Sequence, residues 1–220
     1  MADDLLPDPL PDNPLPLFNA WFEHATVQRA QPNPDAMVLA SVGDDGAPSA
    51  RVVLCKQVNA DAGYLVFFTN YESRKGRELA HHPRAAAVFH WDPLHRQVRV
   101  EGRVLRSPET ESDRYFASRA LTSRIGAWAS RQSAPLASRG ELIRRAAAMA
   151  LRYGVALGAT EGAVPRPPHW GGLRLWIEKI ELWSEGGFRI HDRALWTREL
   201  QPDAQSGFAG GPWLATRLNP

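Results

Sequence analysis

The sequence is poor in cysteine and contains no long apolar run. Its one cysteine, Cys55, excludes an internal disulfide framework, and the apolar context RVVLC predicts a strand residue in place of a reactive thiol. No apolar stretch reaches the length of about 18 residues that a membrane-spanning helix needs. The N-terminal stretch MADDLLPDPLPDNP is acidic and proline-rich, whereas a secretory signal is basic and then apolar. We therefore expect a cytoplasmic protein with no membrane partner.

The usual motifs of nucleotide and metal sites are also missing. The sequence has neither GxxxxGK[ST] nor a GxGxxG between a strand and a helix, so a nucleotide cofactor would need another phosphate cradle. Several histidines lie between residues 81 and 95, but no CxxC or HExxH spacing joins them. We therefore expect no metal site.

Lysine is scarce, so nearly all of the positive charge is arginine. Of the 26 lysines and arginines only three are lysine, and with 24 aspartates and glutamates the formal net charge is +2. The excess of arginine has two explanations, namely a GC-rich genome or the planar, bidentate recognition of phosphate and carboxylate groups. Because no basic block suggests binding to nucleic acid or to a membrane, discrete small anions are the expected ligands.

The chain does contain enough apolar material for a core. Its 220 residues, 44% hydrophobic and 9% aromatic, fit one large globular domain. The prolines and aspartates of residues 1–14 predict a flexible N-terminal segment, and residues 15–220 are expected to form a single domain. Asn13 and Pro14 predict the start of a helix.

Strand patterns outnumber helix patterns. Short helices are predicted after Ser73 and Ser107, and a capping box of Ser138 and Glu141 begins an alanine-rich helix that ends at Gly154. No βαβ unit repeats, so a small antiparallel barrel with appended helices is the expected fold. The predicted strands are 36–42, 49–58, 64–70, 84–91, 95–106, 173–183, 188–196 and 213–218.

Two segments have the composition of an anion site. In TNYESRKGREL a strand end meets a capped helix start, where free backbone N–H groups come together with Arg74 and Lys75; the alternative is a solvated helix start. In RYFASR, Tyr115 and Arg119 are i and i+4 on one predicted helical face, which suits a phosphate clamp or an ordinary surface pair.

Two further segments raise questions of geometry. Arg51 and Lys56 lie five apart on one strand and therefore on opposite faces, unless a β-bulge intervenes or the lysine reaches round from the strand end. In RIHDR, alternation along a strand would direct Arg189, His191 and Arg193 to one face. Such a row is either a functional surface or the solvated face of an antiparallel strand.

Taken in order, these segments resemble the pyridoxine/pyridoxamine 5′-phosphate oxidase family. The resemblance covers roughly residues 14–220; each motif is weak alone, but the ordered set is specific. The matching segments are RVVLCK, FFTNYESRKG, RQVRVEG, YFASR, SRIGAWASRQS, WGG, IELW, RIHDR and the terminal RLNP.

The resemblance implies a mainly β fold, an antiparallel Greek-key split β-barrel with appended helices, and a homodimer that binds FMN at the subunit interface. It places Gln132 and Ser133 in the FMN phosphate site from the partner subunit. The implied FMN-binding residues are Arg51, Val52, Val53, Leu54, Lys56, Phe68, Thr69, Arg74, Lys75, Gln97, Gln132, Ser133, Trp183 and Arg193.

The resemblance also implies the reaction, which is oxidation of pyridoxamine or pyridoxine 5′-phosphate to pyridoxal 5′-phosphate with FMN and dioxygen, releasing hydrogen peroxide. Arg189 and His191 would be the catalytic residues beside the pyridine ring. The implied substrate-binding residues are Lys56, Tyr115, Arg119, Ser123, Arg189 and His191.

The sequence departs from the family pattern at three places. The N-terminal segment lacks the Arg-Arg-x-Tyr motif that folds over the substrate in many members, Ala120 stands where proline is usual, and Phe68 replaces a common tyrosine. Two alternatives stay open. One is a related FMN oxidase of another pathway, of the phenazine type, and the other is a non-catalytic carrier of flavin or pyridoxal phosphate.

Overall fold

A computed structural model describes residues 5–156, 159 and 162–220. The chain divides into two compact units. The barrel unit comprises Met1–Phe67, His82–Leu105 and Arg174–Pro220, and the helical unit comprises Phe68–His81 and Arg106–Leu173. No helix among the described residues combines the length and the apolar character needed to cross a membrane.

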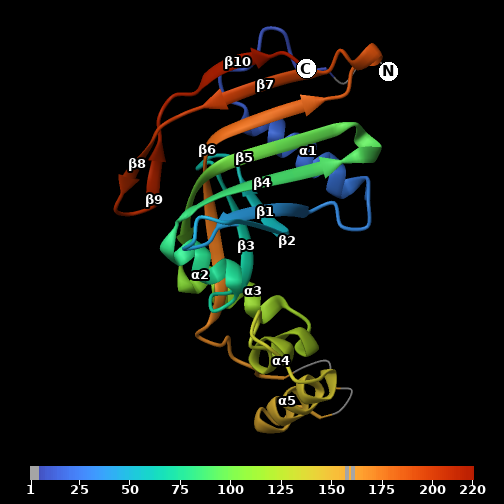
Figure 1. Ribbon diagram of the computed structural model, residues 1–220, viewed down its shortest axis with the longest axis vertical. Helices are drawn as coiled ribbons and strands as arrows, with labels where there is room; N and C mark the ends of the chain where they lie inside the picture. Colours follow the sequence, from blue (N-terminus) through green and yellow to red (C-terminus); the bar gives the residue numbers. More distant parts are fainter. Residues whose placement is uncertain (1–4, 157–158, 160–161) are drawn as a thin grey trace. The chain divides into compact units, whose positions relative to one another are not determined.

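The barrel unit is built on a closed antiparallel sheet. In the strand order β6-β3-β2-β1-β4-β5, the last strand pairs back with β6, which closes a six-stranded barrel, and β7 and β10 extend the sheet beyond β6 (Figure 1). This is the predicted split-barrel fold with helices. Its strands are β1 (Ala36–Val42), β2 (Pro48–Asn59), β3 (Tyr64–Asn70), β4 (Arg84–Trp91), β5 (Arg96–Arg106), β6 (Trp170–Ser184), β7 (Asp192–Thr197) and β10 (Leu214–Leu218).

The predicted hairpins form in register. β1 pairs with β2 from Ala36 opposite Leu54 to Val42 opposite Pro48, around the expected turn at Asp45-Gly46. On β5, buried and more exposed residues alternate as the valine pattern predicts. The hydrophobic face of each strand therefore fixes the register, because a slip of one residue would turn that face out of the core.

One helix of the barrel unit packs on this core. α1 (Leu15–Val27) begins where predicted, and the side chain of Asn13 accepts a hydrogen bond from the Leu15 N–H at 3.1 Å. From α1, Phe18 packs its fully buried ring against Phe89 of β4, with 5.6 Å between the ring centroids. Aromatic burial of this kind, worth about 2–3 kcal/mol per ring, holds the helix to the sheet.

The C-terminal strands differ from the prediction in two ways. The expected strand 188–196 begins only at Asp192, because Phe188 and Arg189 have left-handed backbone angles (φ 57° and 65°) and form a short 3-10 turn. Gly186 makes this turn possible, since a Cβ there would lie 1.7 Å from the carbonyl oxygen of Ile190. Secondly, the stretch expected as a turn around SGFAGG forms a hairpin of β8 (Leu200–Asp203) and β9 (Gly207–Gly210).

The N-terminal segment, expected to be flexible, makes specific contacts from residue 5 onward. Leu6 is buried and its N–H donates to the carboxylate of Asp192 at 2.9 Å. The Trp196 indole donates to the carbonyl oxygen of Pro11 at 2.8 Å, and Arg217 donates to that of Pro7 at 2.8 Å. These bonds tie the segment to β7 and β10.

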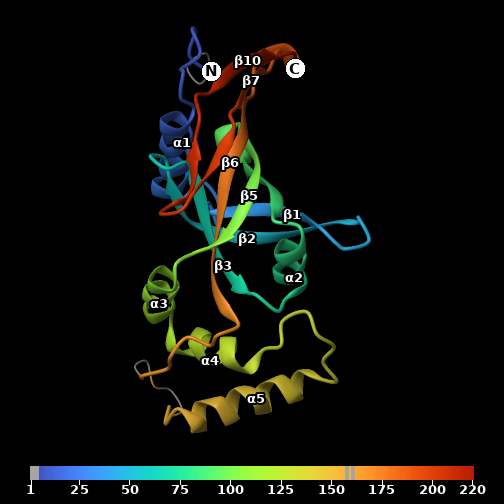
Figure 2. The same ribbon diagram turned by 90° about the vertical axis from the view of Figure 1, so that its left-hand side faces the viewer.

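The helical unit contains four α-helices among its described residues. Ser73 caps α2 as predicted, because its hydroxyl accepts from the N–H of Gly76 at 3.2 Å, and Ser138 caps α5 by accepting from Glu141 at 3.2 Å. Figure 2 shows α5 alongside α4, where Leu121 and Ile125 form a small apolar cluster with Val164. The helices are α2 (Arg74–His81), α3 (Glu109–Ser118), α4 (Leu121–Ala129) and α5 (Arg139–Arg152).

Closure of the barrel between β5 and β6 depends on Gly102. A Cβ at this position would lie 1.7 Å from the carbonyl oxygen of Trp176, a backbone atom that cannot rotate away. We expect Gly102→Ala to lower the free energy of unfolding by at least about 3 kcal/mol, measured by urea denaturation. Gly126→Ala is the matched control, because its Cβ would meet nothing within 4 Å and alanine favours a helix by up to about 1 kcal/mol. Equal losses for the two variants would contradict this account of closure.

Candidate anion-binding site

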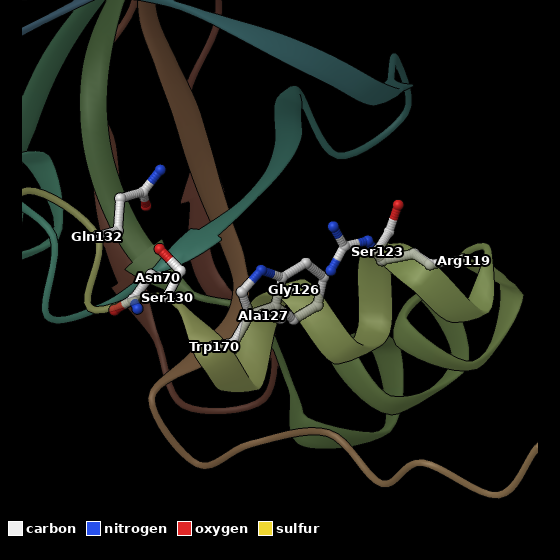
Figure 3. Close-up of a pocket in the computed structure, with 8 residues that line it drawn as sticks. All are labelled: Asn70, Arg119, Ser123, Gly126, Ala127, Ser130, Gln132 and Trp170. Atoms are coloured by element: carbon white, nitrogen blue, oxygen red, sulfur yellow. The ribbon is translucent and has the colours of Figure 1, made fainter. Parts of the chain in front are cut away.

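A pocket of about 320 Å³ opens within the helical unit (Figure 3). It lies where the end of β3 and the start of β6 meet α4 and the residues that flank that helix. None of the described residues that line it is acidic. They are Asn70, Arg119, Ser123, Gly126, Ala127, Ser130, Gln132 and Trp170.

Three aromatic rings stack beside this pocket. Phe68 lies nearly parallel to Tyr115, with 3.9 Å between centroids and 13° between planes, and nearly parallel to Trp170 at 5.5 Å and 10°. Phe116 meets the same indole edge-on at 5.1 Å. The stack joins β3, α3 and β6, so the rings fix one another in orientation.

Arg119 is the cation of the pocket. Its guanidinium lies 4.6 Å from the centroid of the Trp170 ring, and in Figure 3 the group is directed toward that ring. Its Nη1 atom is buried and has no hydrogen-bond partner among the described residues. Burial lowers the pKa of Arg119 from its ordinary value, and the nearby Tyr115 opposes this shift. A buried N–H donor without an acceptor indicates that an anion belongs here.

Tyr115 lies in the last turn of α3, and Arg119 is the residue that caps its C-terminal end. α3 ends at Ser118, and the ψ angles of Arg119 (148°) and Ala120 (141°) turn the chain out of the helix. Both side chains contact Trp170. Its ring is parallel to that of Tyr115 at 6.2 Å between centroids, and the Arg119 guanidinium lies over the same ring.

Near the start of α2 lies a second cation of the helical unit. Lys75 is only 9% exposed, and its Nζ lies 3.4 Å from the hydroxyl of Ser73 and 3.5 Å from Oε1 of Gln132. Gln132 thus contacts Lys75 within one chain, whereas the family resemblance assigned it to the partner subunit. Arg74 is largely exposed and donates from Nε to Glu78 at 2.7 Å. Ser133 follows Gln132 with a left-handed backbone (φ 71°).

Two predicted site residues on β2, Arg51 and Lys56, lie in the barrel unit. Arg51 donates to the hydroxyls of Ser41 and Ser49 and to the carbonyl oxygen of Leu39. The register with β3 shifts between Cys55 and Gln57, which leaves Lys56 as the extra residue of a β-bulge. The bulge considered from the sequence is therefore present, at the lysine itself, and Lys56 pairs with Asp35 at 2.6 Å.

The segment RIHDR carries its functional groups on a turn and a strand. The ring of His191 lies 4.8 Å from that of Trp183, and its Nδ1 accepts the Gly186 N–H at 3.3 Å, so the proton of the neutral ring is on Nε2. Arg193 is paired with Trp183 in the register of β7 and β6. Its guanidinium donates to the buried carboxylate of Glu181 at 2.9 and 3.1 Å.

Other predicted contacts are distributed over both units. On β2, Val52 and Leu54 are exposed while Val53 is partly buried, and Gln97 on β5 is also partly buried. In the helical unit Thr69 is buried and Ser123, on the first turn of α4, is exposed at the pocket. Arg189 is exposed on the 3-10 turn. Burial raises the pKa of the Cys55 thiol to about 12, in keeping with an inert strand residue.

Trp170, Asn70 and Ser130 line the pocket but were missed as site residues. Trp170 stood in the motif WGG, and its residue type is a common partner for arginine, yet no spacing in the sequence connects positions 119 and 170. Asn70 ends a strand pattern and Ser130 follows a helix pattern, so both were explained by local structure alone.

The closed antiparallel barrel with its helices defines a split-barrel protein, and its helical unit carries a pocket with a half-buried arginine and no acidic residue among the described residues that line it. Family models agree: residues 24–153 match the model described as pyridoxamine 5′-phosphate oxidase, and residues 170–220 match the pyridoxine 5′-phosphate oxidase C-terminal dimerisation region. The chain belongs to the pyridoxine/pyridoxamine 5′-phosphate oxidase family.

Curated relatives and solved structures give the degree of similarity. A pyridoxine/pyridoxamine 5′-phosphate oxidase of Burkholderia mallei is 53% identical over 208 residues, and one of Burkholderia lata is 50% identical over 208 residues. Each alignment covers 94% of this chain and 89% of the relative. The crystal structure of PhzG from Burkholderia lata 383, in complex with tetrahydrophenazine-1-carboxylic acid, has a TM-score of 0.82 at 31% identity and covers 99% of this chain and 98% of that one.

The family proline missing at position 120 gives a prediction about stability. Ala120 has a φ of −52°, its predecessor is extended, and its N–H makes no hydrogen bond with the described residues, so the backbone already fits proline. We expect Ala120→Pro to raise the free energy of unfolding by about 0.4–1 kcal/mol, because the unfolded chain loses freedom. Urea denaturation measures this change.

The control is the same substitution at Ala117 inside α3. There proline would remove a helical hydrogen bond and cost about 3 kcal/mol. A loss of stability in Ala120→Pro would show that the backbone of the native protein is not extended at Arg119 and Ala120.

Proposed function

We propose that the protein oxidises pyridoxamine 5′-phosphate and pyridoxine 5′-phosphate at C4′ to pyridoxal 5′-phosphate, with dioxygen as the acceptor and hydrogen peroxide as a product. Oxidation of the amine also consumes water and releases ammonia. Family membership at about 50% identity over nearly the whole chain supports this reaction.

The observation that carries the proposal is the buried Nη1 atom of the half-buried Arg119, which has no hydrogen-bond partner among the described residues. A substrate phosphate is an anion that would satisfy this donor, and a guanidinium bound to phosphate gains charge-assisted hydrogen bonds. Ser123 is placed at the same pocket to add a hydroxyl donor, and Tyr115 approaches through the aromatic stack. We assign Lys56 to the substrate phosphate as well, on the family resemblance.

We propose FMN as the cofactor. When bound, FMN would accept a hydride from the substrate and pass the electrons to dioxygen. The donors present near α2 fit its phosphate, because Lys75 is a buried cation beside the capped start of a helix and beside Gln132. Arg51, Arg74 and Ser133 would complete the phosphate contacts. The flavin would meet Val52, Val53, Leu54, Lys56, Phe68, Thr69, Gln97, Trp183 and Arg193.

Two residues are proposed to act at the reacting end of the substrate. In its neutral form the His191 ring carries its proton on Nε2, so this nitrogen can donate a hydrogen bond to the pyridine ring. Arg189 would orient the reacting group. Both effects position the substrate; neither residue has to carry out the redox step itself.

We also propose that the protein acts as a homodimer. The match of residues 170–220 to a dimerisation region supports this, and so does an apolar surface on the barrel unit. Val38 and Val52 are opposite each other in the β1–β2 register and are 43% and 66% exposed, with Leu54 close by at 38%. Apolar side chains grouped on one sheet face are a common feature of subunit interfaces.

The alternative is an oxidase that acts on a substrate without phosphate, as in phenazine formation. The structural similarity to PhzG keeps this class in view. A phosphate-free substrate would leave the Nη1 donor of Arg119 buried without an anion, which costs about 1–3 kcal/mol. That cost favours the phosphorylated substrate.

One assay tests the proposal directly. The purified protein should be yellow with an FMN spectrum, and in air it should convert pyridoxamine 5′-phosphate to pyridoxal 5′-phosphate with one hydrogen peroxide per product. A yellow protein that turns over neither the amine nor the alcohol would be a flavin carrier, and a colourless protein that fails to bind added FMN would contradict the cofactor assignment.

Arg74 and Arg77 on α2 offer a matched test of the FMN phosphate site. Arg74→Ala should weaken FMN affinity about 10- to 100-fold, because a charge-assisted phosphate contact is worth about 1.5–3 kcal/mol. Arg77, on the same helix, contacts the carbonyl oxygen of Glu72, and Arg77→Ala should leave the affinity within about twofold. Quenching of flavin fluorescence on titration measures both; equal affinity in the two variants would return the start of α2 to an ordinary solvated helix.

A further inference from the structure

Arg119 is oriented without help from any acidic residue of its pocket. Several described arginines pair with a carboxylate, as Arg193 does with Glu181. In the pocket, by contrast, the described lining residues are neutral apart from Arg119 itself. Something other than an ion pair must therefore hold this guanidinium in place.

We propose that Trp170 is the positioning residue that holds Arg119 for the substrate phosphate through a cation–π contact, and thereby sets the preference for phosphorylated substrates. The inference rests on the proposed function, which supplies the phosphate. It assigns a role to one more residue, and it explains how the Arg119 guanidinium can be oriented while its charge stays available to the substrate phosphate.

The indole of Trp170 is a fixed platform. It is 7% exposed, lies nearly parallel to Phe68 and meets Phe116 edge-on. Its backbone is also held, because its carbonyl oxygen accepts from Arg166 at 2.8 Å. A ring fixed on several sides gives the guanidinium a rigid surface 4.6 Å from its centroid, nearer than the second ring that the group meets, that of Phe116 at 5.7 Å.

A ring and a carboxylate would orient Arg119 with opposite consequences. A carboxylate would take up the N–H donors and cancel the charge, so an incoming phosphate would have to displace it. A ring face attracts the cation through its π-electrons and uses none of the N–H groups at the edge of the guanidinium. Nη1 accordingly stays without a partner among the described residues.

The contact predicts a loss of phosphate recognition in variants of Trp170. In FMN-loaded enzyme, Trp170→Leu should weaken binding of pyridoxal 5′-phosphate by about 10- to 30-fold, since a desolvated cation–π contact contributes about 2 kcal/mol. Binding of pyridoxal, which has no phosphate, should change by less than about threefold. Trp170→Phe keeps a ring and should lie between wild type and Trp170→Leu.

A thermodynamic cycle separates positioning from general damage. In an Arg119→Met background, Trp170→Leu should cost less than about twofold in pyridoxal 5′-phosphate affinity, because the group that the ring positions is gone. Trp128→Leu is the matched control: this tryptophan belongs to the same unit, packs against Tyr153 with the two rings tilted by 46°, and does not line the pocket. It should not alter the ratio of the two ligand affinities.

The outcomes distinguish the inference from the proposed function. If Arg119→Met weakens pyridoxal 5′-phosphate but Trp170→Leu is equally costly with and without Arg119, the positioning role is overturned while the phosphate site stands. If Arg119→Met changes the affinities for pyridoxal 5′-phosphate and for pyridoxal by the same factor relative to wild type, the phosphate assignment and this inference are both overturned. Should Trp170→Leu fail to fold, Trp170→Phe and Trp170→Tyr carry the same cycle with an expected loss of about three- to fivefold for phenylalanine.

Discussion

A half-buried guanidinium, with no carboxylate among the described residues that line its pocket, is the constraint on which the proposed site depends. Burial of a cation away from water is unfavourable, and it lowers the pKa of Arg119. The chain compensates with the π-face of Trp170, and the Nη1 donor without a partner is left for a ligand. The stacked rings of Phe68 and Tyr115, and the extended linker that ends α3 before Arg119, are both consistent with this arrangement.

The barrel unit supplies the second set of functional groups by ordinary sheet geometry. Pairing of β6 with β7 places Trp183 opposite Arg193. The ring of His191, the residue just before β7, lies 4.8 Å from the Trp183 ring. Glu181 is buried between Arg193 and Arg99 and holds both, at 2.9 and 3.2 Å. Asp192, the first residue of β7, accepts a hydrogen bond from the Leu6 N–H and pairs with Arg217. The N-terminal segment therefore contacts the RIHDR region although it lacks the family lid motif.

The sequence predicted the barrel well because its strands carry two independent signals. Burial alternates along β1, β4 and β5 between the predicted turns, and Ser73 and Ser138 cap their helices as expected. Prediction failed where the backbone departs from regular geometry. The left-handed pair Phe188 and Arg189 interrupts the expected strand, and neither residue type favours a positive φ, so the sequence did not predict it.

The candidate site was predicted residue by residue only through the family resemblance. Composition and spacing alone suggested an anion site near Arg74 and Arg119, but each had an equally simple surface explanation. What the residues could not reveal is the contact between positions 119 and 170, because fifty residues separate them and the intervening helices decide whether they meet. Burial of Nη1 without a hydrogen-bond partner among the described residues, the feature on which the proposed role of Arg119 rests, exists only in the folded chain.

The ratio of kcat/KM for pyridoxamine 5′-phosphate to that for pyridoxamine tests the central claim most directly. The two substrates have the same reacting carbon and differ only in the phosphate. If a buried arginine and its neighbours form a phosphate site, the ratio should be at least about 100, because two charge-assisted contacts of about 1.5 kcal/mol or more are lost with the phosphate. A ratio within about threefold of one would contradict the account and show that Arg119 serves another purpose.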